Sequence, residues 1–170
     1  MKERNNLYPV FLKTAKLHVL IIGGGNVAEE KLRFLTKSSP DARVTIVAPE
    51  FGEATKKLAQ DFGVTLITDY YKPEYLDGKH IVIATTDKPG VNITVYEDCR
   101  RRDKLVNVAD NPPYCDFYMG GIVTRGMLKW QFPPTANRPP LPNACVNSLK
   151  KCSLRISIRW YRTSMITGKP

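Results

Sequence analysis

A glycine-rich segment carries the most specific chemistry in this sequence. Residues 23–28, Gly-Gly-Gly-Asn-Val-Ala, fit the pattern G-x-G-x-x-A between a short apolar run and a segment of helical periodicity. Gly23 allows a tight turn, Gly25 lets the backbone approach a diphosphate, and Ala28 permits close helix–strand packing. The N–H groups and dipole at the start of a helix hold the anion. The segment predicts a dinucleotide site, with a turn that serves packing alone as the alternative. The residues expected to bind are Gly23, Gly24, Gly25, Asn26 and Val27.

Two other apolar runs end in residues suited to a nucleotide. Glu50, preceded by Pro49, follows the second run, where a carboxylate can accept a ribose hydroxyl and repel a 2′-phosphate. We therefore expect Pro49 and Glu50 to contact the cofactor. Thr85 and Thr86 end a later run, and their small hydroxyl side chains suit the wall of a ribose or nicotinamide site. Turn chemistry leading into Pro89-Gly90 explains these threonines equally well.

Asp110 is the candidate catalytic residue. It lies just past the end of the last apolar run, residues 105–108. A carboxylate at that place can take a proton as a hydride leaves a substrate. The alternative is a turn or capping aspartate before Asn111-Pro112-Pro113.

The elements that would position these residues alternate along the chain. Strands and helices that recur every 20 to 30 or so residues indicate right-handed crossovers and a parallel sheet covered on both faces. We therefore predict an α/β fold, a doubly wound parallel sheet of Rossmann type, with its ligand site beyond the carboxyl ends of the strands. The expected strands are 16–22, 43–47, 64–67, 80–84 and 105–108, and the expected helices are 27–35, 53–62 and 91–102. In the first helix we expect Val27, Lys31, Phe34 and Leu35 to share the apolar face.

Charge divides the chain in two. The whole chain carries 26 basic and 16 acidic residues, a net charge of +10, yet residues 127–170 contain 8 basic residues, no acidic residue and 6 of the 13 prolines. We expect residues 1–126 to form the nucleotide-binding domain and residues 127–170 to be a basic, poorly ordered tail. The interleaved aromatic and basic residues of that tail also raise a nucleic-acid-binding alternative, which we consider the weaker interpretation.

Metal sites and membrane insertion have little support in the sequence. The four cysteines form no C-x-x-C pair, and His18 and His80 fall within or beside expected strands, so we predict no metal ligands. No apolar run is long enough to span a membrane, and the polar N-terminus is unlike a secretory signal. We therefore expect a cytoplasmic protein.

Several of these motifs together resemble one family. The segments that carry the resemblance are residues 8–12 (Tyr-Pro-Val-Phe-Leu), the glycine segment with Lys31, residues 47–49 (Val-Ala-Pro), residues 84–87 with Asn92, residues 107–110 (Asn-Val-Ala-Asp) followed by 115–117 (Cys-Asp-Phe), and residues 122–126. With them, about residues 7–129 resemble the precorrin-2 dehydrogenase / sirohydrochlorin ferrochelatase family, the NAD-binding module of siroheme synthase.

The resemblance implies a reaction and its participants. In this family precorrin-2 passes a hydride to NAD and becomes sirohydrochlorin, and some members then insert ferrous iron. The essential aspartate of the family maps onto Asp110. For the carboxylates of the tetrapyrrole we favour Arg125, and we expect Arg100, Arg101 and Arg102 to be a solvated helix end. A non-catalytic nucleotide-binding regulatory module is the alternative function.

The resemblance stops where the composition changes. The genetic code allows this segment to be read in another frame. If each codon of residues 129–140 is read from the third base of the codon before it, the DNA can encode Val-Ala-Ile-Ser-Thr-Asn-Gly-Lys-Ser-Pro-Thr. This sequence is similar to a substrate-pocket segment of the family. We therefore predict that the chain from about Trp130 is a frameshifted reading. The family forms a homodimer through its C-terminal region, so this chain is expected to lack the dimer-forming part and to be weakly active or inactive.

Overall fold

The computed structural model describes residues 6–125 and 128–132. The chain divides into two compact units, Met1–Tyr118 and Met119–Pro170, each described by itself. This division falls a few residues before the change in composition at Gly126.

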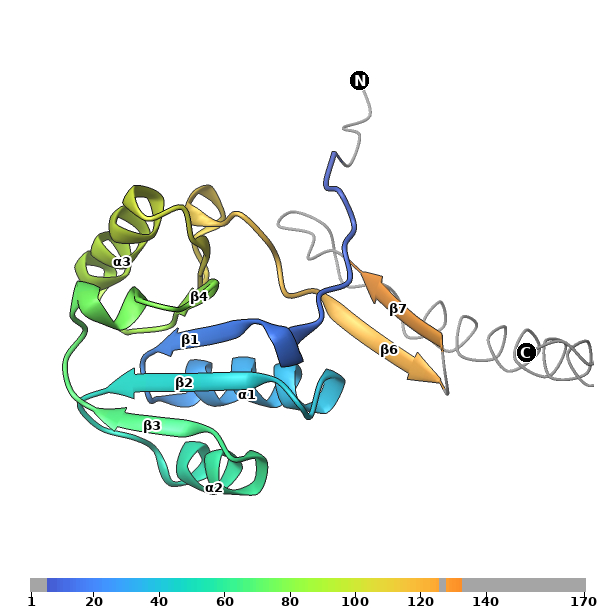
Figure 1. Ribbon diagram of the computed structural model, residues 1–170, viewed down its shortest axis with the longest axis horizontal. Coiled ribbons are helices and arrows are strands. Elements are labelled where there is room, and N and C mark those ends of the chain that lie inside the picture. Colours follow the sequence, from blue (N-terminus) through green and yellow to red (C-terminus); the bar gives the residue numbers. More distant parts are fainter. Residues whose placement is uncertain (1–5, 126–127, 133–170) are drawn as a thin grey trace, which may run out of the picture. The chain divides into compact units, whose positions relative to one another are not determined.

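The first unit is built on a parallel sheet of five strands (Figure 1). The strands are β1 (His18–Ile22), β2 (Arg43–Ala48), β3 (Thr65–Thr68), β4 (Ile81–Ala84) and β5 (Leu105–Val108). Their order is β3-β2-β1-β4-β5. Strands β2 and β3 therefore lie on one side of β1, and β4 and β5 lie on the other side. The predicted doubly wound α/β fold is confirmed.

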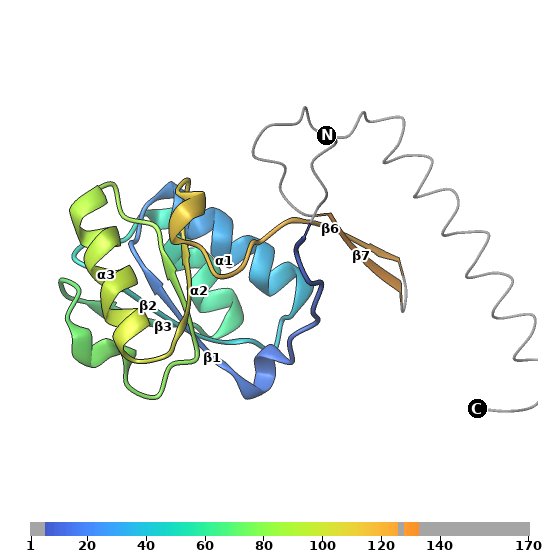
Figure 2. The same cartoon turned by 90° about the horizontal axis from the view of Figure 1, so that it is seen from above.

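Helices cover both faces of the sheet. The helices α1 (Asn26–Ser38) and α2 (Glu53–Phe62) pack together on one face, and α3 (Pro89–Arg101) lies on the other (Figure 2). Three short 3-10 helices, η1 (Thr14–Lys16), η2 (Pro73–Leu76) and η3 (Pro112–Tyr114), lie in the connections. Gly63 ends α2 at φ 63°, the left-handed conformation in which glycine has no Cβ penalty.

The central strands are buried because helices cover both sides of them. Every residue of β4 is buried, as are Val19 to Ile22 of β1. Val95 and Cys99 of α3 are fully buried and belong to the hydrophobic core between this helix and the sheet. Apolar runs without polar alternation are what a sheet covered on both faces requires.

The apolar face of α1 differs from the predicted one. The expected face included Phe34, whose side chain is 43% exposed. The structure instead buries Ala28, Leu32 and Thr36, which recur every four residues along one side of the helix. Thr36 fits this face because its hydroxyl donates to the carbonyl of Leu32 at 2.9 Å, so no polar group is buried without a partner. The spacing of apolar residues did not reveal the buried face of α1, because Thr36 on that face is polar.

This correction gives a stability prediction. Leu32→Ala should lower the free energy of unfolding by about 3 kcal/mol, because it leaves a cavity under α1. Phe34→Ala removes a larger side chain from a partly exposed place and should cost about 0.5 kcal/mol. Urea denaturation of the two variants measures both values. If both variants lost the same free energy of unfolding, Phe34 would be a core residue after all.

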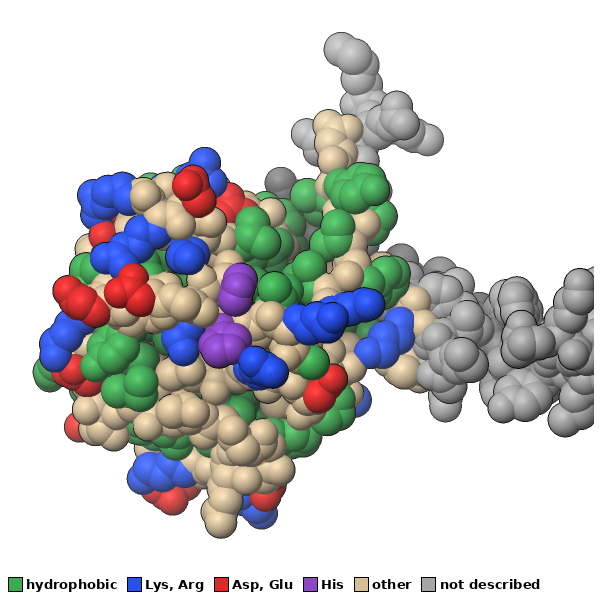
Figure 3. Space-filling view, in the orientation of Figure 1, with side chains coloured by type: hydrophobic (Ala, Val, Ile, Leu, Met, Phe, Trp, Pro, Cys, Tyr) green, Lys and Arg blue, Asp and Glu red, His purple; other side chains and the backbone are tan. Residues whose placement is uncertain are grey.

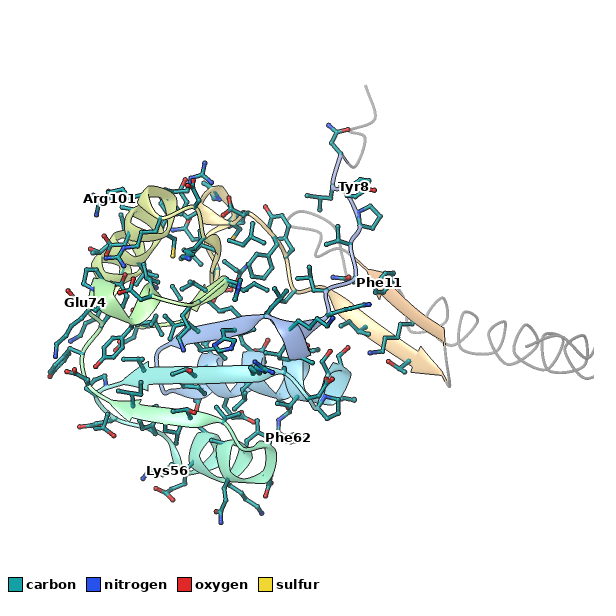
Figure 4. The ribbon with its side chains drawn as sticks, viewed as in Figure 1. Tyr8, Phe11, Lys56, Phe62, Glu74 and Arg101 are labelled. Atoms are coloured by element: carbon teal, nitrogen blue, oxygen red, sulfur yellow. The ribbon has the colours of Figure 1, made fainter. Side chains whose placement is uncertain are left out.

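The segment before η1 contributes little to this core. Residues 7–12 expose their apolar side chains, with Tyr8 87% and Phe11 74% exposed, and both project from the N-terminal segment in Figure 4.

The second unit contains an antiparallel pair of strands, β6 (Gly121–Arg125) and β7 (Leu128–Phe132), in which Gly121 pairs with Phe132. Strand β7 thus lies within residues 127–170, which we expected to be a poorly ordered tail, and regular pairing extends to Phe132. The rest of the predicted tail, residues 133–170, lies outside the described residues. In the described ranges, no helix has the length and apolarity that a membrane crossing needs.

Candidate nucleotide site

The predicted site residues lie in loops that leave one edge of the sheet. Parallel strands end at the same edge, and backbone hydrogen bonds continue beyond the strand ends. Gly23 N–H donates to the Val47 carbonyl at 2.9 Å, and Thr85 N–H donates to the Ile22 carbonyl at 2.8 Å. Beyond β5, Ala109 N–H donates to the Ala84 carbonyl at 2.9 Å. The glycine turn, the Glu50 loop, the threonines and Asp110 therefore follow β1, β2, β4 and β5 at this edge.

The glycine turn has the shape that a diphosphate site needs. Gly23 has φ 121°, and a Cβ there would lie 2.6 Å from the Thr85 hydroxyl oxygen, so only glycine fits. Gly25 is the N-cap of α1, and a Cβ there would meet nothing within 4 Å. No side chain forms a capping hydrogen bond at the start of α1, so the first N–H groups of the helix can donate to a ligand. Open space in front of such donors fits a bound anion.

Gly24 has a role that the motif does not predict. A Cβ on Gly24 would lie 2.1 Å from the Glu50 carbonyl oxygen and 2.9 Å from the Cβ of Ala48. Its carbonyl accepts hydrogen bonds from Gly52 N–H at 3.0 Å and from the hydroxyl of buried Thr55 at 3.3 Å. The glycine turn and the loop from Ala48 to Gly52 are therefore in direct contact.

Pro49 and Glu50 lie in this contacting loop with exposed side chains. The backbone of Glu50 is fixed against Gly24, whereas its carboxylate faces solvent at the edge where a cofactor ribose would lie. The geometry leaves Glu50 available for the predicted role.

The two threonines are placed differently. Thr85 is 7% exposed, and its hydroxyl donates to the Ile22 carbonyl at 2.9 Å, so it ties the end of β4 to β1. Thr86 is held by Asn92, whose amide oxygen accepts from the Thr86 hydroxyl at 2.7 Å and whose amide nitrogen donates to the Thr86 carbonyl at 2.9 Å. Turn chemistry therefore uses the Thr86 hydroxyl, whereas the Thr85 hydroxyl joins two strands.

Asp110 has an unusual backbone conformation. Among the described non-glycine residues, only Asp103 and Asp110 have positive φ, and Asp110 has φ 57°. Aspartate tolerates this left-handed region better than most residues, and such conformations gather at functional sites. Asp110 is exposed, in the turn that follows β5.

Asp69 is a carboxylate at the same edge that the sequence analysis missed. It follows β3, and its N–H donates to the Ala48 carbonyl at 3.1 Å. Lys72 and the Tyr75 hydroxyl each donate to its carboxylate at 2.6 Å, and these bonds lower the pKa of Asp69 to about 2. Its position one residue after an apolar run was the available signal.

The arginines at the end of α3 are ion-paired. Arg100 pairs with Asp116 at 3.2 Å, Arg101 with Asp98 at 2.5 Å, and Arg102 with Asp77. The expected solvated helix end is therefore also joined to other segments by Arg100 and Arg102, whereas the Arg101 pair lies within α3. The side chain of Arg125, our candidate for substrate carboxylates, lies outside the described residues.

The two histidines lie at the opposite, amino edge of the sheet, side by side in Figure 3. The His80 ring accepts from the His18 N–H through Nδ1 at 3.0 Å. The described part of the chain holds no group of three or more histidine, cysteine or acidic side chains arranged for a metal ion.

A parallel sheet with a glycine turn at the point where the strand order reverses defines a Rossmann-type nucleotide-binding domain. Residues 10–121 match a protein family described as putative NAD(P)-binding, and the chain belongs to this family.

The chain is similar to siroheme synthases and to a solved dehydrogenase. It is 43% identical over 123 residues to a siroheme synthase of Psychrobacter sp. (strain PRwf-1), covering 72% of this chain and 25% of that protein. It is 37% identical over 121 residues to the siroheme synthase of Pseudoalteromonas atlantica, covering 71% and 26%. The chain thus spans about a quarter of the length of these curated relatives. The solved structure of SirC, precorrin-2 dehydrogenase, has the same fold, with a TM-score of 0.68, 20% identity, and 85% and 70% of the two chains covered.

Proposed function

We propose that this chain carries the module for NAD-dependent oxidation of precorrin-2 to sirohydrochlorin in siroheme biosynthesis. The observation that carries the proposal is the placement of Asp110, held in a left-handed turn at the edge of the sheet that also bears the glycine turn. Similarity to siroheme synthases over the same residues supports it. A nucleotide sensor would have no need of a carboxylate at that place.

The residues that would hold NAD fit it. The first N–H groups of α1, from Asn26 and Val27, would bind the diphosphate in front of Gly25. Glu50 would accept a ribose hydroxyl, and the Thr85–Thr86 segment would form part of the wall through its backbone. When bound, NAD supplies the acceptor for a hydride.

Asp110 would move the proton. Oxidation of precorrin-2 removes two hydrogens, one as a hydride and one as a proton, and an exposed carboxylate beside the reacting carbon can take the proton. For ferrous iron as a second substrate, the same carboxylate would accept pyrrole N–H protons as the metal enters. In the complete family protein we infer that a homodimer closes this site.

The test of the function uses a chimera, a siroheme synthase whose N-terminal part is replaced by residues 1–126 of this chain. Supplied with precorrin-2 and NAD, the chimera should form NADH and sirohydrochlorin together, followed by absorbance. Binding of NAD without any turnover would favour the regulatory module instead.

Cofactor preference is a separate prediction, made for the chain itself. We expect NAD to bind at least about tenfold more tightly than NADP, because the Glu50 carboxylate would repel a 2′-phosphate. Glu50→Gln should narrow this ratio, measured by calorimetric titration with both cofactors. Glu74→Gln is the matched control, since Glu74 is an exposed carboxylate on η2, in the connection between β3 and β4. A ratio unchanged by Glu50→Gln would remove Glu50 from the ribose site.

A further inference from the structure

The turn that carries Asp110 is closed by a segment that pairs with β5. Asp116 N–H donates to the Val106 carbonyl at 2.8 Å, and its carboxylate accepts from the Val106 N–H at 3.0 Å. One residue further on, the Asn107 side-chain amide donates to the Phe117 carbonyl at 2.8 Å. The two ends of the loop from Ala109 to Tyr114 are therefore held together at its base.

Cys115 follows this loop, and its side chain contacts the backbone at the start of the loop. Its Sγ is 3.2 Å from the Val108 carbonyl oxygen and 3.3 Å from the Asn111 carbonyl oxygen. The Asn107 amide nitrogen lies 3.4 Å from the same sulfur and can donate to it. Burial raises the pKa of the Cys115 thiol, so at neutral pH the sulfur keeps the proton that a carbonyl oxygen accepts.

The two carbonyls that the thiol contacts are those on either side of Ala109 and Asp110. Asn111 N–H also donates to the Val108 carbonyl at 3.2 Å, so Val108 and Asn111 are the ends of a tight turn. Asp110 occupies the left-handed region in this turn, which costs a non-glycine residue free energy unless its surroundings hold it there. Cys115 is the side chain that contacts both ends of the turn.

We propose that Cys115 is a positioning residue, whose thiol holds the Val108–Asn111 turn and so fixes the direction of the Asp110 carboxylate. The use of that carboxylate in catalysis rests on the proposed function, whereas the holding of the turn does not. Asn107 supports the same arrangement from β5, because it contacts both Cys115 and the closing segment.

The first measurement is amide hydrogen exchange in the full chain, followed by NMR. Cys115→Ala should speed exchange of the Asn111 amide roughly five- to tenfold, as expected for loss of one hydrogen bond. Cys115→Ser should leave it near the wild-type rate, because a hydroxyl can donate to the same carbonyls. The Ala109 amide, bound to Ala84 of β4, reports any general loosening.

The second measurement is turnover of precorrin-2 by the chimera with the same substitutions. Cys115→Ala should lower kcat at least about tenfold with KM and NAD affinity unchanged, since small misplacements of a catalytic group are costly. Cys115→Ser should recover most of the rate. Cys99→Ala is the matched control, because this fully buried cysteine of α3 should affect stability but not the Asn111 amide.

Opposite outcomes are distinguishable. If Cys115→Ala lowers only the melting temperature and leaves Asn111 exchange and kcat unchanged, Cys115 is a packing residue and the proposal is overturned. If the wild-type chimera fails to oxidise precorrin-2, the proposed function fails, and Asn111 exchange still decides whether Cys115 holds the turn. If Cys115→Ala does not fold, Cys115→Val replaces it, since valine fills the space of the thiol and lacks the donor.

Discussion

Asp110→Asn should abolish most of the precorrin-2 oxidation by the chimera. We expect kcat to fall about 10²- to 10⁴-fold, the usual contribution of a general base. Asparagine has the same shape and also tolerates the left-handed conformation at φ 57°, so the turn should survive. The affinity for NAD should change by less than about twofold, because Asp110 follows β5 whereas the glycine turn follows β1. Steady-state kinetics and calorimetric titration measure the two effects.

Asp103→Asn is a closely matched control. Asp103 is also exposed and also has a positive φ, 52°, but it lies in the turn between α3 and β5, at the amino edge of the sheet. Its substitution should leave both kcat and NAD affinity unchanged. If Asp110→Asn behaved like this control, Asp110 would be a structural turn residue and the base would have to be sought elsewhere.

Gly24→Ala should strongly destabilise the protein. The added Cβ would lie 2.1 Å from the Glu50 carbonyl oxygen, a backbone atom that cannot move without shifting its loop. We expect a loss of about 3 kcal/mol, at the upper end of the cost of overpacking. The melting temperature should fall by on the order of 10 °C. Because the shifted loop carries Glu50, the preference for NAD over NADP should narrow in whatever protein remains folded.

Gly25→Ala separates stability from binding. A Cβ on Gly25 meets nothing within 4 Å, so this variant should unfold at nearly the wild-type temperature. The same methyl group would occupy the space in front of the first N–H groups of α1, so NAD affinity should fall. Gly90→Ala, in the first turn of α3 and equally free of contacts, controls for the general effect of replacing glycine in a helix. A Gly24→Ala protein as stable as Gly25→Ala would contradict the contact between the two loops.

The sequence by itself determined the order of elements and the edge of the sheet at which the candidate site residues lie. Short apolar runs specify strands covered by helices on both faces, and the residues that follow them lie at the carboxyl edge of the sheet. For that reason the tight turn at Gly23 and the position of Asp110 followed from local patterns.

The tertiary structure alone decided which contacts constrain each residue. Gly24 occupies a variable position of the motif, yet the Glu50 loop, 26 residues away in the chain, leaves no room for a side chain there. Thr36 is part of the buried face of α1 because its hydroxyl donates a hydrogen bond to the Leu32 carbonyl. A search for regularly spaced apolar residues does not detect such a threonine. Cys115 acquired its contacts with Val108 and Asn111 only when the chain folded back along β5. Packing between segments distant in sequence depends on distances that residue types and spacing do not encode, whereas strand ends and turns depend on neighbours along the chain.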